Sequence, residues 1–162
     1  MGMAYCIEHM HQLTPPMIYK NLHSSIIYLT EDYIAKISYF SFWNEATTSK
    51  MGSMTMELLD MRSGIESNIY NFGVKLLEMV TDRLPYSVDN SPLIDWAFRG
   101  EQSLKEIVDP TLKGFQEEEL KKLLEVIRSC VHLDPKQRPT MREVTARLRE
   151  ITATGPDGTT YT

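Results

Sequence analysis

The side chains near the N-terminus that could hold a metal ion are Cys6, His9 and His11. Zinc sites use cysteine and histidine ligands at fixed spacings, usually four of them. Only Cys6 and His9 share helical spacing, and no fourth ligand follows nearby. The pattern therefore predicts no metal site. The second cysteine, Cys130, lies far away in the sequence, and two cysteines cannot form a disulfide framework, so both are expected to be reduced thiols.

A glycine-rich loop that could cradle phosphates is missing from the sequence. The eight glycines form no G-x-G-x-x-G pattern, and the only close pair is Gly155 and Gly158 near the C-terminus. The net charge of −5 argues against a nucleic-acid partner, because proteins that bind nucleic acids carry basic surfaces. No stretch approaches the roughly 18 consecutive apolar residues of a membrane helix. The most apolar run, residues 74–80, is interrupted by Lys75 and Glu78, so no membrane segment is expected.

Five segments in a fixed order point to one kind of chemistry. Residues 18–26 read IYKNLHSSI, residues 39–41 read YFS and residues 55–57 read TME. NIYNFG follows at 68–73 and DPKQRP at 134–139. In this order and spacing they resemble the catalytic loop, the D-F-G and A-P-E motifs, the start of the central helix and the final arginine turn of protein kinases. The resemblance covers nearly the whole chain and implies a kinase large lobe, the C-lobe, with the N-lobe absent.

The amino-acid sequences of two segments resemble those of plant receptor-like kinases. Residues 72–86 (FGVKLLEMVTDRLPY) and 134–141 (DPKQRPTM) are typical of the leucine-rich-repeat group. The resemblance implies a plant signalling protein. Its parent would be a plasma-membrane receptor with this lobe on the cytoplasmic side, and the fragment by itself is expected to be cytoplasmic.

Where kinases carry their catalytic residues, this chain retains none of them. The position of the catalytic aspartate holds Asn21, and an amide cannot accept the proton of a substrate hydroxyl as a carboxylate does. The positions of the two family ligands for Mg²⁺ hold Ile26 and Tyr39, which offer no carboxylate or amide oxygen to the cation. The degenerate positions are Tyr19, Lys20, Asn21, His23, Ile26, Tyr39, Phe40 and Ser41. The resemblance thus implies a pseudokinase that has lost Mg·ATP, the cofactor of the family, and no other cofactor is expected.

Four residues keep structural roles that the resemblance implies. Glu57 and Arg138 stand where the family forms a buried ion pair between the activation segment and the lobe. Asn68 replaces the aspartate that binds the backbone of the catalytic loop, and its amide oxygen can still accept one such bond. Gly73 is retained in the central helix.

The elements that would position these residues are mostly helical. Apolar periodicity and capping signals predict helices in the first twelve residues and at 69–81, 93–98, 116–131 and 140–151. Residues 26–29 and 34–38 predict a β-hairpin, and residues 41–66 are expected to be irregular. The predicted class is mainly α, a kinase-like C-lobe helical bundle with one small hairpin. Residues 1–152 form the expected domain, and residues 153–162 a disordered tail.

Three functions remain open on the sequence alone. The first is an inactive large-lobe fragment that acts as a protein-interaction module, with full-length receptor-like kinases or their substrates as partners. The second is a Ser/Thr kinase with residual ATP-dependent activity. The third is a truncated gene product without function, which agrees with Met1 standing inside a helical pattern.

Overall fold

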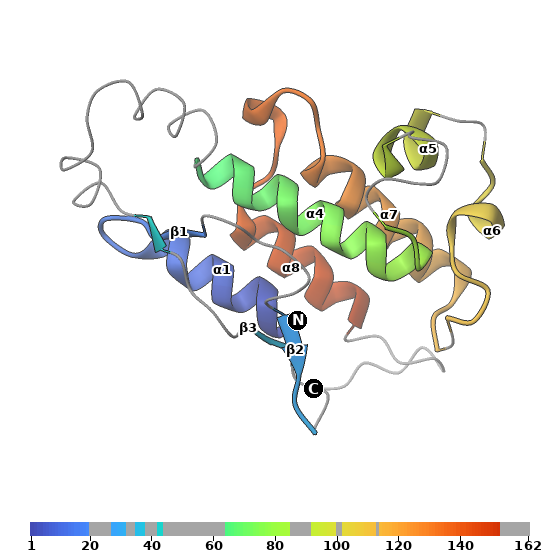
Figure 1. Ribbon diagram of the computed structural model, residues 1–162, viewed down its shortest axis with the longest axis horizontal. Helices are drawn as coiled ribbons and strands as arrows, with labels where there is room; N and C mark the ends of the chain where they lie inside the picture. Colours follow the sequence, from blue (N-terminus) through green and yellow to red (C-terminus); the bar gives the residue numbers. More distant parts are fainter. Residues whose placement is uncertain are drawn as a thin grey trace.

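The computed structural model describes residues 1–19, 27–31, 35–37, 42–43, 64–84, 92–99, 102–112 and 114–152. Most of these residues are helical (Figure 1). The helices are α1 (Gly2–Gln12), α4 (Ile65–Thr81), α5 (Leu93–Arg99), α6 (Leu104–Ile107), α7 (Glu117–Cys130) and α8 (Met141–Thr152), with a 3₁₀ turn, η2, at Pro135–Gln137. The predicted mainly helical class is confirmed. The expected tail at 153–162 lies outside the described residues.

Two short antiparallel strand pairs accompany the helices. Strands β2 (Ile27–Leu29) and β3 (Ala35–Ile37) pair with Ile27 opposite Ile37, as the predicted hairpin requires. Strands β1 (Ile18–Tyr19) and β4 (Phe42–Trp43) form a second pair, with Tyr19 opposite Phe42. The sequence prediction placed residues 42–43 in an irregular segment and was wrong there, because a two-residue strand is too short to show an alternating pattern.

Helix α4 forms the centre of the fold. It packs against α7, α7 packs against α8, and α8 packs against α1, and Figure 1 shows α4 crossing the middle of the molecule. The largest side chains that are fully buried come from these helices and from α5, namely Ile7, Asn68, Leu77, Leu93, Ile127, Cys130, Met141 and Val144. Each buried aliphatic side chain of this size stabilises the fold by about 1.5–3 kcal/mol. One continuous core therefore joins the N-terminal helix to the last helix.

Helix α4 begins four residues earlier than the sequence suggests, at Ile65 instead of Ile69. Its N-cap, Gly64, has extended backbone angles, and the first turn carries the acidic Glu66. A carboxylate in the first turn is favourable at the positive end of the helix dipole. The helix ends at Thr81, because the next residue, Asp82, has a left-handed backbone with φ of 51°.

Capping boxes fix the starts of the C-terminal helices. Before α8, the backbone N–H of Thr140 donates to Glu143 at 2.8 Å, and the N–H of Glu143 donates to the Thr140 hydroxyl at 3.3 Å, as predicted. Helix α6 was not predicted, although the Ser103 N–H and hydroxyl both donate to Glu106 in the same way. Four residues are too few to show helical periodicity.

Candidate functional site

The residues predicted from the kinase resemblance fall into two groups. The structure describes Asn68, Gly73, Arg138 and the backbone of Tyr19. The others, Lys20, Asn21, His23, Ile26, Tyr39, Phe40, Ser41 and Glu57, lie outside the described residues. The described site residues therefore belong to the scaffold around the kinase-like motifs.

Strands β1 and β4 hold the two ends of the segment that carries most of the degenerate positions. Strand β1 ends at Tyr19, β4 begins at Phe42, and these two residues are opposite each other. The chain thus leaves the pair just before residue 20 and returns to it just after residue 41. Strand β1 also contacts α4, so the central helix supports the base of this segment.

Asn68, in the first turns of α4, is 1% exposed and binds the last turn of α1. The imidazole Nε2 of His11 lies 3.2 Å from the Asn68 Oδ1 atom. The bond predicted from Asn68 to the backbone of residues 18–26 stays a prediction, because most of those residues lie outside the described part of the chain. The contact with His11 was not foreseen from the sequence. A usable signal was present, because His11 shares one helical face with Ala4 and Ile7, which are both buried.

The environment of His11 disfavours its charged form. Burial lowers the pKa of His11 from its ordinary value, whereas the hydrogen bond to Asn68 and the negative charge of Glu66 act in the opposite direction. Removing the imidazolium from water costs more than these two interactions return. His11 is therefore a neutral structural contact between α1 and α4 at pH 7.

Arg138 binds backbone carbonyl groups at the junction of α4, α7 and η2. Its Nε donates to the carbonyl of His132 at 2.8 Å, and its Nη1 donates to that of Glu66 at 3.0 Å. The guanidinium also lies over the ring of Tyr70, 4.8 Å from its centroid. Partial burial lowers the pKa of Arg138. The ion pair predicted between Arg138 and Glu57 stays a prediction, because Glu57 lies outside the described residues. The described partners of Arg138 are carbonyl oxygens, and its side chain is half-buried.

Gly73 lets α4 approach α7 closely. A Cβ atom built at this position would stand 2.6 Å from the Cβ of Cys130 and 2.9 Å from Cγ1 of Val131. Cys130 is completely buried, and burial raises the pKa of its thiol to about 12. Because the thiolate is the reactive form, this cysteine is unreactive in the folded chain.

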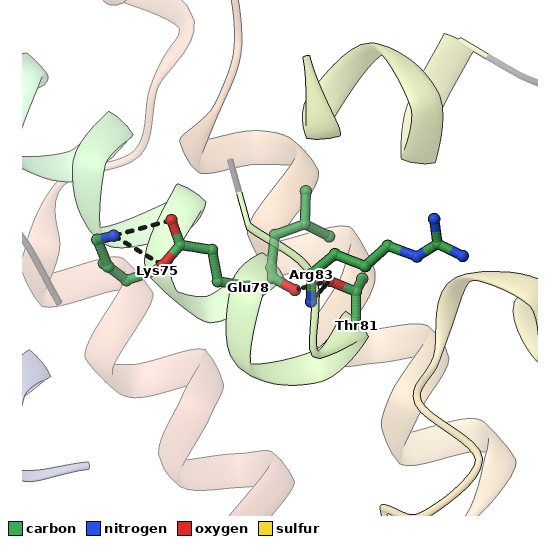
Figure 2. A network of polar contacts seen from close by, with 5 residues as sticks. Lys75, Glu78, Thr81 and Arg83 are labelled. Carbon is green, nitrogen blue, oxygen red and sulfur yellow. Dashed lines mark hydrogen bonds and ion pairs between the residues drawn. The ribbon is translucent and has the colours of Figure 1, made fainter. Parts of the chain in front are cut away.

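A nearly buried ion pair on α4 was not foreseen. Figure 2 shows the Lys75 ammonium in contact with both carboxylate oxygens of Glu78, at 2.8 and 2.7 Å. Only 10% and 12% of these side chains are exposed. The Thr81 hydroxyl donates to the carbonyl of Leu77 at 2.8 Å. It also accepts from the Arg83 N–H at 3.2 Å, as Figure 2 shows. These contacts stabilise the C-terminal part of α4.

The described hydrogen bonds of His11 and Arg138 join separate elements of the fold. The described polar side chains do not converge on a reaction centre. Within the described ranges, no group of three or more His, Cys, Asp or Glu side chains could hold a metal ion. The described ion pairs lie within single helices, with Lys121 bound to Glu117 at 3.0 Å and to Glu118 at 2.8 Å. This part of the chain is a scaffold.

Comparison with known proteins establishes the family. Residues 1–148 match the family described as "Protein tyrosine and serine/threonine kinase". The chain belongs to the protein kinase family. The expectation of a kinase-like large-lobe fold is likewise confirmed by two solved pseudokinases. The apo GRMZM2G135359 pseudokinase is 41% identical with a TM-score of 0.72, and 95% of this chain covers 50% of that one. The pseudokinase DRIK1 (drought responsive inactive kinase 1), solved bound to ENMD-2076, is 39% identical with a TM-score of 0.69, and 95% of this chain covers 51% of it.

Two curated relatives from Arabidopsis thaliana are named as inactive. "Inactive receptor-like serine/threonine-protein kinase At2g40270" is 46% identical over 169 residues, which span 99% of this chain and 33% of that protein. "Probable inactive receptor-like protein kinase At3g56050" is 45% identical over 165 residues, with coverage of 98% and 33%. The kinase-like chain thus spans about a third of these relatives, and their names support an inactive kinase-like fold. In the described part of the chain, no helix is long and apolar enough to cross a membrane.

Proposed function

We propose that this chain is a catalytically inactive receptor-like-kinase large lobe that works by binding other proteins. The proposal rests on one observation: the helix contacts of the kinase fold are retained, whereas the catalytic and metal-ligand residues are replaced. Gly73 and Arg138 make the helix contacts described above, whereas Asn21, Ile26 and Tyr39 stand where the family has its base and its metal ligands. The inactive relatives and pseudokinase neighbours support the same conclusion.

The chemistry of phosphoryl transfer explains why these replacements matter. The reaction depends on positioning and on neutralising phosphate charge with Mg²⁺. Mg²⁺ requires oxygen ligands in near-octahedral geometry, usually including carboxylates. An isoleucine provides no ligand, and a tyrosine is neutral at pH 7. Residual Ser/Thr kinase activity would therefore require other ligands.

The partners we propose are full-length receptor-like kinases or their substrates. The support is family membership, since the relatives named above are receptor-like kinases. A lobe that keeps the fold of a kinase but transfers no phosphate can bind a partner protein without phosphorylating it. Because the chain spans a third of these relatives, its binding role concerns this lobe alone.

A nucleotide-binding assay tests the claim that the chain is catalytically inactive. Only a ligand that binds the folded state raises the melting temperature, so millimolar Mg·ATP is expected to leave it unchanged. The cytoplasmic domain of an active receptor-like kinase serves as the positive control. A saturable rise for this chain, together with Mg-dependent phosphate transfer to a generic substrate, would establish the kinase function instead.

Protein-binding assays test the claim that the chain binds other proteins. The immobilised chain is probed with the cytoplasmic domains of a panel of plant receptor-like kinases and with their substrates. Saturable binding is expected with the native chain and should be lost with Gly73→Val, which disrupts the contact of α4 with α7. No binding across the panel would contradict the interaction role and favour a product without function.

A further inference from the structure

The hydrogen bond between His11 and Asn68 joins the last turn of α1 to the first turns of α4, across 57 residues of sequence. The Asn68 Oδ1 atom is an acceptor only, so the Nε2 atom of His11 must carry the hydrogen. In a neutral imidazole the other nitrogen, Nδ1, then has a lone pair and no hydrogen. The structure thereby assigns the tautomer of His11.

The Nδ1 atom of His11 is shielded from solvent and has no hydrogen-bond partner in the described part of the chain. A proton added there would create a buried N–H with no acceptor, on a ring that now carries a charge. Among the described groups, only Glu66 acts electrostatically on His11 in favour of that charge, and Glu66 is itself exposed. A charge on an exposed carboxylate is screened by water and offsets little of the cost of burial.

We propose that His11 makes the contact between α1 and α4 acid-labile, intact while the ring is neutral and weakened when Nδ1 takes up a proton. Strand β1 follows α1 and contacts α4, so this contact also supports the base of the segment with the degenerate positions. This pH sensitivity is independent of the proposed binding function, since it depends only on the contact between α1 and α4.

The direction of the pH effect follows from linkage. Burial lowers the pKa of His11 in the folded chain below its ordinary value of 6.5, which the unfolded chain keeps. Below pH 6.5 the unfolded state therefore binds more protons, and the stability contributed by the neutral contact is lost as the pH falls through the lowered pKa. One proton of difference changes the unfolding equilibrium constant by at most about tenfold per pH unit.

Urea unfolding between pH 5 and pH 8 tests the proposal on three chains: the native chain, His11→Gln and His9→Gln. His9 lies on the same helix with an exposed side chain, so His9→Gln is a matched control. The glutamine at position 11 can still donate to Asn68 but does not titrate. The stability gap between the native chain and His11→Gln should narrow as the pH falls, whereas the gap to His9→Gln should not change.

NMR titration of the native chain provides a test that does not depend on whether a variant folds. The ring signals of His11 should titrate below the ordinary histidine pKa of 6.5. They should also show the Nε2–H tautomer. A His11 midpoint at or above the ordinary value of 6.5, or a stability gap to His11→Gln that does not vary with pH, would overturn the proposal.

Discussion

Replacing Gly73 by alanine tests the close approach of α4 and α7 with a single methyl group. The new Cβ atom would stand 2.6 Å from the Cβ of Cys130 and 2.9 Å from Cγ1 of Val131. An ordinary contact begins at 3.4 Å, so the two helices must separate by roughly 0.8 Å. The Cβ of Cys130 is fixed to the backbone of α7 and is completely buried, and cannot rotate out of the way.

Two opposing effects set the size of the change. In the interior of a helix, alanine is favoured over glycine by about 0.8–1 kcal/mol. Overpacking a well-packed core costs about 1–3 kcal/mol, and a clash with a rigid Cβ belongs at the upper end. The overpacking effect is the larger one, so we expect Gly73→Ala to lower the free energy of unfolding by about 2 kcal/mol.

Urea titration measures this change as a lower midpoint with an unchanged slope. The control is Met79→Ala on the same helix, because Met79 is 70% exposed and its replacement should change stability by less than about 0.5 kcal/mol. Adding Cys130→Gly to Gly73→Ala removes the nearer of the two clashing atoms, so the double variant should be more stable than the sum of the two single effects by at least about 0.5 kcal/mol. If Gly73→Ala gains the stability expected from helix propensity alone, the contact between α4 and α7 is not as described.

Two further substitutions test the polar contacts of the scaffold by urea titration. Arg138→Lys should lose about 1–2 kcal/mol, because one ammonium group cannot reach the carbonyls of both His132 and Glu66 while covering Tyr70. Arg142→Lys, at an exposed position on α8, should be near neutral, and equal midpoints for the two variants would contradict the role of Arg138. Lys75→Ala should cost about 3 kcal/mol by leaving the Glu78 carboxylate without its cation. The paired change Lys75→Met with Glu78→Leu should stay within about 1 kcal/mol of the native chain; a double variant as unstable as Lys75→Ala would argue against this account.

Features with a local cause were predictable from the sequence. Helix α7 has apolar residues at helical spacing, and the Gln116 N–H donates to the Glu119 carboxylate at its start. Helix α8 follows a Thr-x-x-Glu box, and the β2–β3 hairpin follows two β-branched runs with a turn between them. In each case the residues that determine the element lie within a few positions of one another, so the sequence pattern carries the information.

Contacts between distant segments were not predictable in the same way. His11 and Asn68 are 57 residues apart, and neither residue type requires the other. Lys75 looked like a polar interruption of an apolar run, but a sequence pattern does not show what covers a side chain. The kinase resemblance supplied the motif register and predicted a bond from Asn68 to the catalytic-loop backbone, but His11 lies outside the motifs that carry the resemblance.

The described scaffold also explains how a kinase-like chain can lose its chemistry and keep its fold. Large stability changes come from cavities, clashes and broken buried contacts, and the described examples involve Gly73 against Cys130, Lys75 with Glu78 and His11 with Asn68. None of these residues stands at a catalytic or metal-ligand position of the family motifs. Substitutions at those positions can therefore abolish phosphoryl transfer while these contacts stay in place.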